Sequence, residues 1–251
     1  MKQGNVSEWD LPSTVEAQSI ERIGGGGYTW ESGVYLTTVK MVYLNQSKGG
    51  AISFNVLLEN ANGKELKEAM WVRSGDAKGN KSYYTGRDGV DHPLPGYSVA
   101  NSMCVAATGT SLAECMASAE KKSVNLYNPE LKKEVATERP VLMALLNTSV
   151  SVAVSQITED KTAMNSSGEY VPTGDTRIVN ECKFFGNTAG LTTEEILEGK
   201  PAVMFDKWAA KNNGVVIDKT SKGTTATESA ASILNTTASS TTASSALSMF
   251  N

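Results

Sequence analysis

The region between residues 33 and 73 constrains the fold most, because three strand-like runs follow one another there with only tight turns between them. The runs 33–44, 51–58 and 64–73 are rich in β-branched and aromatic residues or alternate between apolar and polar side chains. The short segments that separate them supply the Asn and Gly residues that hairpin turns require. This combination predicts an antiparallel meander of three strands.

The meander is expected to have one apolar and one polar face, since successive side chains of a strand point to opposite sides. In the third run, Leu66, Met70 and Val72 fall on one face. Trp71 and Arg73 fall on the other face, together with a lysine. A tryptophan beside cations on a polar face indicates a binding surface.

The size and charge of the chain limit which partners it can have. With 251 residues and a formal net charge of -4, it can bury one sizeable core and is not basic overall. A nucleic-acid partner would therefore have to meet a local group of cations. The apolar runs are far shorter than the roughly 20 residues of a membrane helix, and the polar N-terminus is not typical of a signal peptide. We therefore expect a cytoplasmic protein with no membrane partner.

Residues that commonly hold metals or perform catalysis are few. Cys104, Cys115 and Cys182 are odd in number and widely spaced, so we expect reduced, buried thiols. His92 is the only histidine and lies in the proline-containing segment 91–96, which is expected to form a rigid turn at the surface. Because no second histidine or suitable nucleophile accompanies it, the sequence predicts no metal site, no cofactor and no enzyme activity.

The segment 75–89 alternates cations with two tyrosines between glycines. Such a loop can close over a strand of nucleic acid, with the cations reaching phosphates and the tyrosines stacking on bases. A solvated hairpin with two half-buried tyrosines is the alternative. Because Trp71 and Arg73 lead directly into this loop, we favour binding.

The rest of the chain is expected to add helices and further strands. Ser111 and Glu114 match a capping box, and residues 149–157 form the clearest alternating run of the second half. In chain order, the expected elements are helices over 97–107 and 111–119, strands over 121–127 and 131–137, a helix over 141–146, a strand over 149–157, a loop or hairpin tip over 158–174, a strand over 176–185 and a two-part helix over 192–212.

Composition divides the chain into an N-terminal arm (1–23), a central domain (24–217) and a Ser/Thr/Ala-rich tail (218–251). The tail is expected to be disordered, because it cannot bury enough apolar surface to offset the entropy of ordering it. The four glycines at 24–27 indicate a hinge and not a phosphate-binding loop, since a strand and not a helix follows them. Candidate partner-docking residues at the apolar end of the tail are Leu247, Met249 and Phe250.

Short stretches in a particular serial order extend over about residues 20 to 212. They include Trp30-Glu-Ser-Gly-Val-Tyr35, Leu66-Lys-Glu-Ala-Met-Trp-Val72, Glu169-Tyr-Val-Pro-Thr-Gly174 and Phe205-Asp-Lys-Trp208. In this order they resemble the OB-fold single-stranded DNA-binding proteins of lytic tailed bacteriophages. The resemblance implies a mainly β fold with peripheral helices, built on an OB-fold-like, partly open antiparallel barrel with strands 51–58 and 64–73 on its binding face. A β-sandwich or jelly roll is the alternative that the alternation of the strands leaves open. It also implies a protein that coats single-stranded DNA (ssDNA) during phage DNA replication, recombination and repair in the host cytoplasm.

The tail departs from the family pattern. Many such proteins end in an acidic tail that recruits replication or recombination partners, whereas this tail has only Asp218 and Glu228 against Lys219 and Lys222. Recruitment through acidic charge is therefore not expected. Docking of replication or recombination proteins through Phe250 stays open.

The candidate ssDNA site combines aromatic side chains for stacking with cations for phosphate contacts. Tyr35 and Tyr43 share one face of the first strand and either join this site or fill the barrel. The alternative function is that of a structural or interaction protein, such as a virion decoration protein, which predicts no salt-sensitive DNA binding. The predicted DNA-binding residues are Lys40, Tyr43, Lys67, Trp71, Arg73, Lys78, Lys81, Tyr83, Tyr84 and Arg87.

Overall fold

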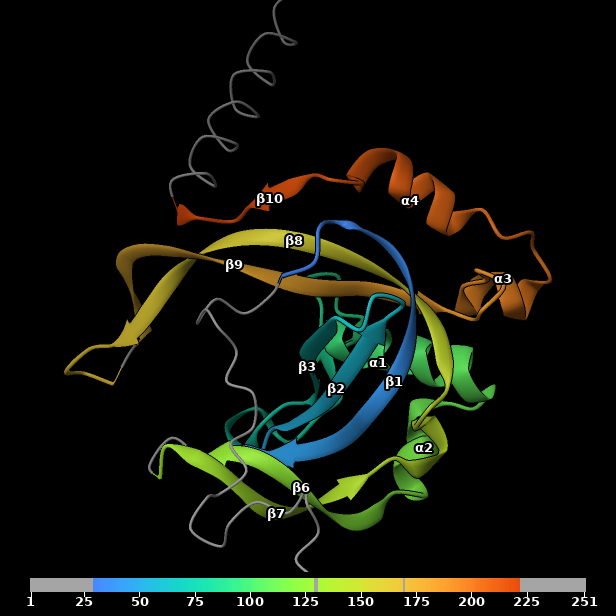
Figure 1. Cartoon of the computed structure of the whole chain (residues 1–251). Helices are drawn as coiled ribbons and strands as arrows, with labels where there is room; N and C mark the ends of the chain where they lie inside the picture. The colour runs from blue at the N-terminus through green and yellow to red at the C-terminus, as the bar shows by residue number, and fades with distance from the viewer. Residues whose placement is uncertain (1–28, 129–130, 169, 222–251) are drawn as a thin grey trace, which may run out of the picture.

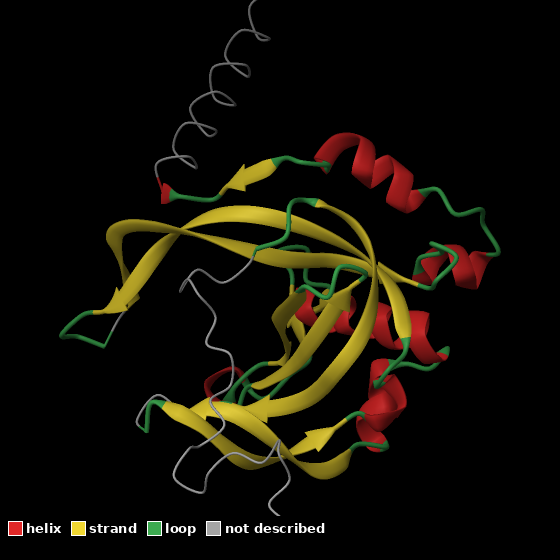
Figure 2. Ribbon diagram, in the orientation of Figure 1, coloured by secondary structure: helices red, strands yellow, loops and turns green. Residues whose placement is uncertain are grey.

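The computed structural model describes residues 29–128, 131–168 and 170–221, and consists mainly of antiparallel β-strands with few helices (Figure 1, Figure 2). The strands are β1 (Gly33–Gln46), β2 (Ile52–Asn60), β3 (Glu65–Arg73), β4 (Tyr83–Thr85), β5 (Asp91–Pro93), β6 (Glu120–Asn128), β7 (Lys133–Val141), β8 (Ser149–Met164), β9 (Tyr170–Gly186) and β10 (Val216–Asp218). The α-helices are α1 (Pro95–Thr108), α2 (Leu112–Ala117), α3 (Thr193–Glu198) and α4 (Met204–Asn212), and the 3₁₀ helices are η1 (Asp76–Lys78) and η2 (Met143–Leu145).

The predicted antiparallel meander is confirmed, because β1 pairs with β2 and β2 pairs with β3. Its apolar face is buried: Phe54 and Leu58 are fully inaccessible, and Met70 is nearly so. Gly50 and Gly63 have φ values of 80° and 69° in the two turns, a left-handed conformation that glycine adopts without steric penalty.

Five strands curve around the main core in the order β3-β2-β1-β8-β9. Among the described strands β3 pairs only with β2 and β9 only with β8, so the curved sheet stays open between β3 and β9. We call this opening the seam. Helix α1 contacts both strands, and the hydroxyl oxygen of Ser102 on α1 accepts a hydrogen bond from the backbone N–H of Phe185 on β9 (3.2 Å).

The core lies between the curved sheet and α1. Met103 of α1 is fully buried together with Phe54 of β2 and Phe185 of β9. All three cysteines are free and buried, as predicted. Since burial of apolar surface contributes about 25 cal/mol per Å², this cluster holds the sheet and α1 in one unit.

Two hairpins lie on opposite sides of the meander (Figure 1). The β8–β9 hairpin forms one side, and the β6–β7 hairpin joins the other side through the pairing of Val141 with Tyr43 of β1. β10 pairs in parallel with β8. The two hairpins therefore flank the exposed face of the meander.

The predicted helices α1 and α2 are confirmed, and so is the division of the last helix into α3 and α4. Ser111 and Glu114 form the capping box that the sequence predicts, and Thr192 and Glu195 form another at the start of α3. Gly199 ends α3 with a left-handed φ of 61°.

The predicted helix over 141–146 is wrong. β7 continues through Val141, and only the short η2 follows. The reason is tertiary: Val141 pairs with β1, and the N–H of Leu142 donates to the carbonyl oxygen of Val42 (3.1 Å). These sheet contacts satisfy the backbone groups that a helix would otherwise pair internally.

Other boundaries also differ from the prediction. Of the two alternatives predicted for residues 158–174, a loop or a hairpin tip, the hairpin is confirmed, with its turn closed by a bond from Gly168 N–H to the Asn165 carbonyl oxygen (3.0 Å). Part of the expected turn 91–96 is strand β5. The fold also includes residues 218–221, which the sequence analysis assigned to the tail. The predicted arm, the glycine hinge and the rest of the tail lie outside the described residues.

Candidate nucleic-acid interface

Strand β3 presents Trp71 to the exterior. The side chain is 52% exposed, whereas its neighbours Met70 and Val72 point inward and are buried. At Gly96, the second residue of α1, an added Cβ would lie 2.5 Å from the carbonyl oxygen of Trp71. Glycine at this position lets α1 begin directly against β3, and the helix supports the strand from behind. The exposed indole of Trp71 is therefore carried by a strand whose other face packs against α1.

A groove of about 900 Å³ follows the seam, and we call it the seam groove. Its two walls come from β3 and from the β8–β9 hairpin, segments that are about a hundred residues apart in sequence. Trp71 lies in one wall, and Arg177 and Ile178 lie in the other. The full lining is Thr29, Glu65, Leu66, Lys67, Glu68, Ala69, Trp71, Glu159, Arg177, Ile178, Val179 and Asn180.

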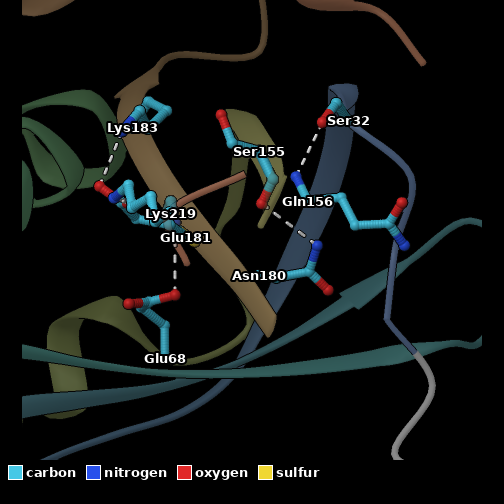
Figure 3. A network of polar contacts seen from close by, with 9 residues as sticks. Ser32, Glu68, Ser155, Gln156, Asn180, Glu181, Lys183 and Lys219 are labelled. Atoms are coloured by element: carbon cyan, nitrogen blue, oxygen red, sulfur yellow. Dashed lines mark hydrogen bonds and ion pairs between the residues drawn. The ribbon is translucent and has the colours of Figure 1, made fainter. Parts of the chain in front are cut away.

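Hydrogen bonds fix the wall formed by β9 (Figure 3). The side chain of Asn180 accepts from the N–H of Trp30 and donates to the carbonyl oxygen of the same residue, each at 2.7 Å. Beside it, the carboxylate of Glu181 accepts from the ammonium groups of Lys183 and Lys219, also at 2.7 Å each. The chain that enters the fold at Trp30 is therefore tied to the groove wall.

Glu68 links the two walls. Its position on β3 has the same parity as Met70, so its side chain points inward, and its Oε2 accepts a hydrogen bond from the N–H of Cys182 on β9 (3.3 Å; Figure 3). Burial raises the pKa of Glu68 to about 7, because water is largely excluded from the carboxylate. Burial likewise raises the pKa of the Cys182 thiol, so this thiol is not a reactive thiolate.

A second hollow of about 640 Å³ lies between the meander and β6, and we call it the hairpin groove. Lys67, Glu68 and Ala69 line both grooves, so the two hollows meet over the middle of β3. Tyr127 of β6 is 63% exposed in this lining, and Tyr43 of β1 is half-buried. The other lining residues are Met41, Asn55, Val56, Leu57, Ser123, Val124, Asn125, Leu126 and Glu134.

The charges of the grooves are mixed. Lys67 is exposed and has no ion-pair partner among the described residues, whereas Arg177 pairs with Glu159 at 2.7 Å. The linings also contain Glu65 and Glu134, so carboxylates outnumber cations there. More cations lie along the neighbouring β6–β7 hairpin, where Lys121, Lys132 and Lys133 are exposed.

The cation–tyrosine loop (75–89) contains η1 and, with β5, the β4–β5 hairpin. Lys81 Nζ lies 5.1 Å from the ring centroid of Tyr83, and the Tyr84 ring lies 5.6 Å from that of His92. The loop is anchored by a bond from the N–H of Asp76 to the carbonyl oxygen of Gly49 (2.8 Å). Neither groove lining contains a residue of this loop.

The predicted site residues are therefore divided in space. Lys67, Trp71 and Tyr43 line the grooves, and Tyr43 thus joins the candidate site. Lys40 pairs with Glu59 at 3.6 Å, and the Nε atom of Arg73 is buried without an acceptor among the described residues. The loop residues Lys78, Lys81, Tyr83, Tyr84 and Arg87 are all exposed and line neither groove.

Sequence reasoning missed several lining residues. Tyr127 ends the predicted strand 121–127, which begins with Lys121 and Lys122, and this combination of an aromatic residue with cations was a usable signal. Glu68 shares the parity of Leu66 and Met70, so the alternation of the strand was the signal that could have placed it inward. No local signal marks Arg177 or Asn180, because their role depends on the fold that brings β9 opposite β3.

The described residues include neither a cluster of metal-ligating side chains nor a helix that could span a membrane. Within residues 29–128, 131–168 and 170–221, no group of three or more His, Cys, Asp or Glu side chains is arranged to hold a metal ion. His92 contacts Asp88 at 3.2 Å on the surface. Each helix in this part of the chain is too short or too polar to cross a bilayer.

The sequence matches no protein-family model, and a search of curated proteins finds no similar sequence. The functional conclusion therefore depends on the geometry of the grooves and on the order of the sequence motifs.

Proposed function

We propose that the protein binds ssDNA with little sequence preference and coats it during phage DNA replication, recombination and repair. The observation that carries this proposal is the position of Trp71, an exposed indole in the wall of the seam groove. Close to it the two grooves meet over Lys67, which has no ion-pair partner among the described residues. Every base has a face that can stack on an aromatic ring, and such stacking is worth about 1–3 kcal/mol per base. Duplex DNA hides these faces, so the arrangement favours single strands.

The strand order supports an OB-fold-like, partly open barrel. In that fold five strands form a Greek-key barrel, and the exposed surface of strands 2 and 3 binds oligonucleotides. Here β1, β2 and β3 are followed by α1 and then, after the β6–β7 hairpin, by β8 and β9. The order β3-β2-β1-β8-β9 with an open seam is compatible with this fold. The hairpin groove lies on β2 and β3, and β3 forms one wall of the seam groove.

The mixed charges suggest how a strand would be oriented. Carboxylates in the groove floor repel phosphates, whereas they can accept hydrogen bonds from the amino groups of bases. We therefore infer that bases face the floor near Glu68 and phosphates face Lys67 and the cations of the β6–β7 hairpin. Stacking would then supply much of the affinity, with a salt-dependent part from phosphate contacts.

One observation favours the second candidate, a structural or interaction protein such as a virion decoration protein. The end of the β8–β9 hairpin exposes Met164, Tyr170 and Val171, with exposed fractions of 60%, 69% and 39%. Exposed apolar side chains that lie together often mark protein contacts. A structural or interaction protein of this kind would show no salt-sensitive binding of DNA.

Fluorescence anisotropy with labelled oligonucleotides distinguishes the two functions. The full chain would be titrated against dT, mixed-sequence single strands and a duplex of equal length at several salt concentrations. The ssDNA proposal expects similar affinity for both single strands, weaker affinity for duplex, and a decrease with salt. Absence of binding at low salt would exclude it and leave the interaction role.

A further inference from the structure

One carboxylate is common to both grooves. Glu68 lines the seam groove and the hairpin groove, and its side chain is partly exposed. Among the described residues it has no ion-pair partner, and only Cys182 donates hydrogen bonds to it, from its N–H (3.3 Å) and from its thiol. A carboxylate offers about four acceptor positions. Glu68 can therefore still accept hydrogen bonds from a ligand that lies in the grooves.

The charge of Glu68 is not neutralised as that of Glu181 is. Glu181 lies near it on β9 and accepts from the ammonium groups of Lys183 and Lys219, at 2.7 Å each (Figure 3). Of these groups, Glu181 disfavours the charge on Glu68 and Lys183 favours it, while burial raises the pKa of Glu68 to about 7. Most Glu68 carboxyls are therefore ionised at pH 8, and in that form the group only accepts hydrogen bonds.

The DNA bases differ in what they offer to such an acceptor. Cytosine, adenine and guanine carry exocyclic amino groups, whereas thymine presents a carbonyl oxygen where cytosine has its amino group. The ring N–H of thymine lies between two carbonyl oxygens, and these oxygens repel an ionised carboxylate. A carboxylate without a cation in the groove therefore suits the bases that carry an amino group.

A single bound strand can reach both Trp71 and Glu68. The two residues are three positions apart on β3, which corresponds to about 10 Å of strand, and both line the seam groove. One base can then stack on the indole while another base of the same strand turns its edge to the carboxylate.

We propose that Glu68 selects a base with an exocyclic amino group, and disfavours thymine, at one position of the bound strand. This selection rests on the proposed function, because it requires ssDNA in the grooves. Only the nucleotide at Glu68 is affected, so most of the affinity stays independent of sequence. One hydrogen bond of this kind changes the affinity by about fivefold.

The first test compares dC and dT oligonucleotides of equal length at pH 8 by fluorescence anisotropy. Both bases are pyrimidines with rings of the same size, so their stacking on Trp71 differs little. We expect the unmodified protein to bind dC about fivefold more tightly than dT. Affinities that agree within about twofold would overturn the inference.

Glu68→Gln tests whether the carboxylate causes the preference. The amide oxygen of glutamine can accept from the Cys182 N–H, which leaves the amide NH₂ to donate into the grooves. Loss of the charge should tighten the binding of both oligonucleotides, and the preference for dC should disappear. The matched control, Glu138→Gln, removes an exposed carboxylate of β7 outside both groove linings and should keep the preference. A preference for dC that persists in Glu68→Gln would overturn the role of Glu68.

The outcomes separate the two proposals. If neither oligonucleotide binds at low salt, the proposed function fails and the selection by Glu68 fails with it. If both oligonucleotides bind equally well, the proposed function stands and the selection alone fails.

Discussion

The carboxylate of Glu68 on β3 accepts a hydrogen bond from the backbone N–H of Cys182 on β9, so one side chain bridges two strands that do not pair with each other. The bond closes the inner side of the seam, while the outer side stays open as a groove. Because the bridge is a carboxylate largely removed from water, its ionisation has consequences for stability.

Glu68→Gln should stabilise the protein at pH 8 and have little effect at pH 4. The pKa of Glu68 rises from an ordinary value of 4.5 to about 7 in the fold. Below pH 4.5 Glu68 is protonated in both the folded and the unfolded protein, so its contribution to stability is fully present there. As pH rises through about 7 this contribution is lost, because the carboxyl ionises more readily in the unfolded chain than in the fold. The loss is on the order of 3 kcal/mol, at about 1.4 kcal/mol per pKa unit. Glutamine keeps an acceptor for the Cys182 N–H and cannot ionise.

Urea unfolding at the two pH values measures this difference, with the exposed Glu138→Gln as control. The control should change stability equally at both pH values. A Glu68→Gln variant that is equally or less stable than the unmodified protein at pH 8 would contradict the expected cost of ionising Glu68.

Trp71→Ala should weaken ssDNA binding by about tenfold, since it removes stacking worth about 1–3 kcal/mol per base. Tyr170→Ala is a suitable control, because Tyr170 is also an exposed aromatic residue but lies outside both groove linings. The affinities of the two variants for a dT oligonucleotide are measured by anisotropy titration, and circular dichroism verifies that both variants fold. A folded Trp71→Ala variant with unchanged affinity would remove Trp71 from the site.

Lys67→Ala should make ssDNA binding less sensitive to salt. On single strands the logarithm of the affinity changes by about 0.7 per neutralised phosphate for each logarithmic unit of salt. We therefore expect the slope to become shallower by about 0.7. Lys211→Ala on α4 removes a cation that is also exposed but lies outside both groove linings, and it should leave the slope unchanged. A slope that stays the same in the Lys67 variant would place the phosphate contacts elsewhere.

Substitutions in the cation–tyrosine loop test how far the proposed ssDNA site extends beyond the grooves. Replacing Lys78, Lys81 and Arg87 together by Ala should flatten the salt slope by about 2, if each meets one phosphate. Titrations over a salt series measure this directly. An unchanged slope would confine the electrostatic contacts to the grooves and the β6–β7 hairpin.

The sequence alone determined the meander, because alternation and turn residues are local features that act over a few positions. The inward direction of Met70 and the outward direction of Trp71 follow from the same period of two. The capping box at Ser111 and Glu114 was equally readable, since both residues belong to one helical turn.

Only the tertiary structure decided which residues meet at the candidate site. Arg177 and Asn180 face β3 because the curved sheet brings β9 round to the seam, and nothing within their own segment predicts that. The same curvature leaves the cation–tyrosine loop outside the grooves, although it follows Trp71 directly in the chain. Val141 became part of a strand because β1 pairs with it. Local preference sets the direction of a side chain, whereas pairing between distant strands sets its neighbours, and a binding site depends on both.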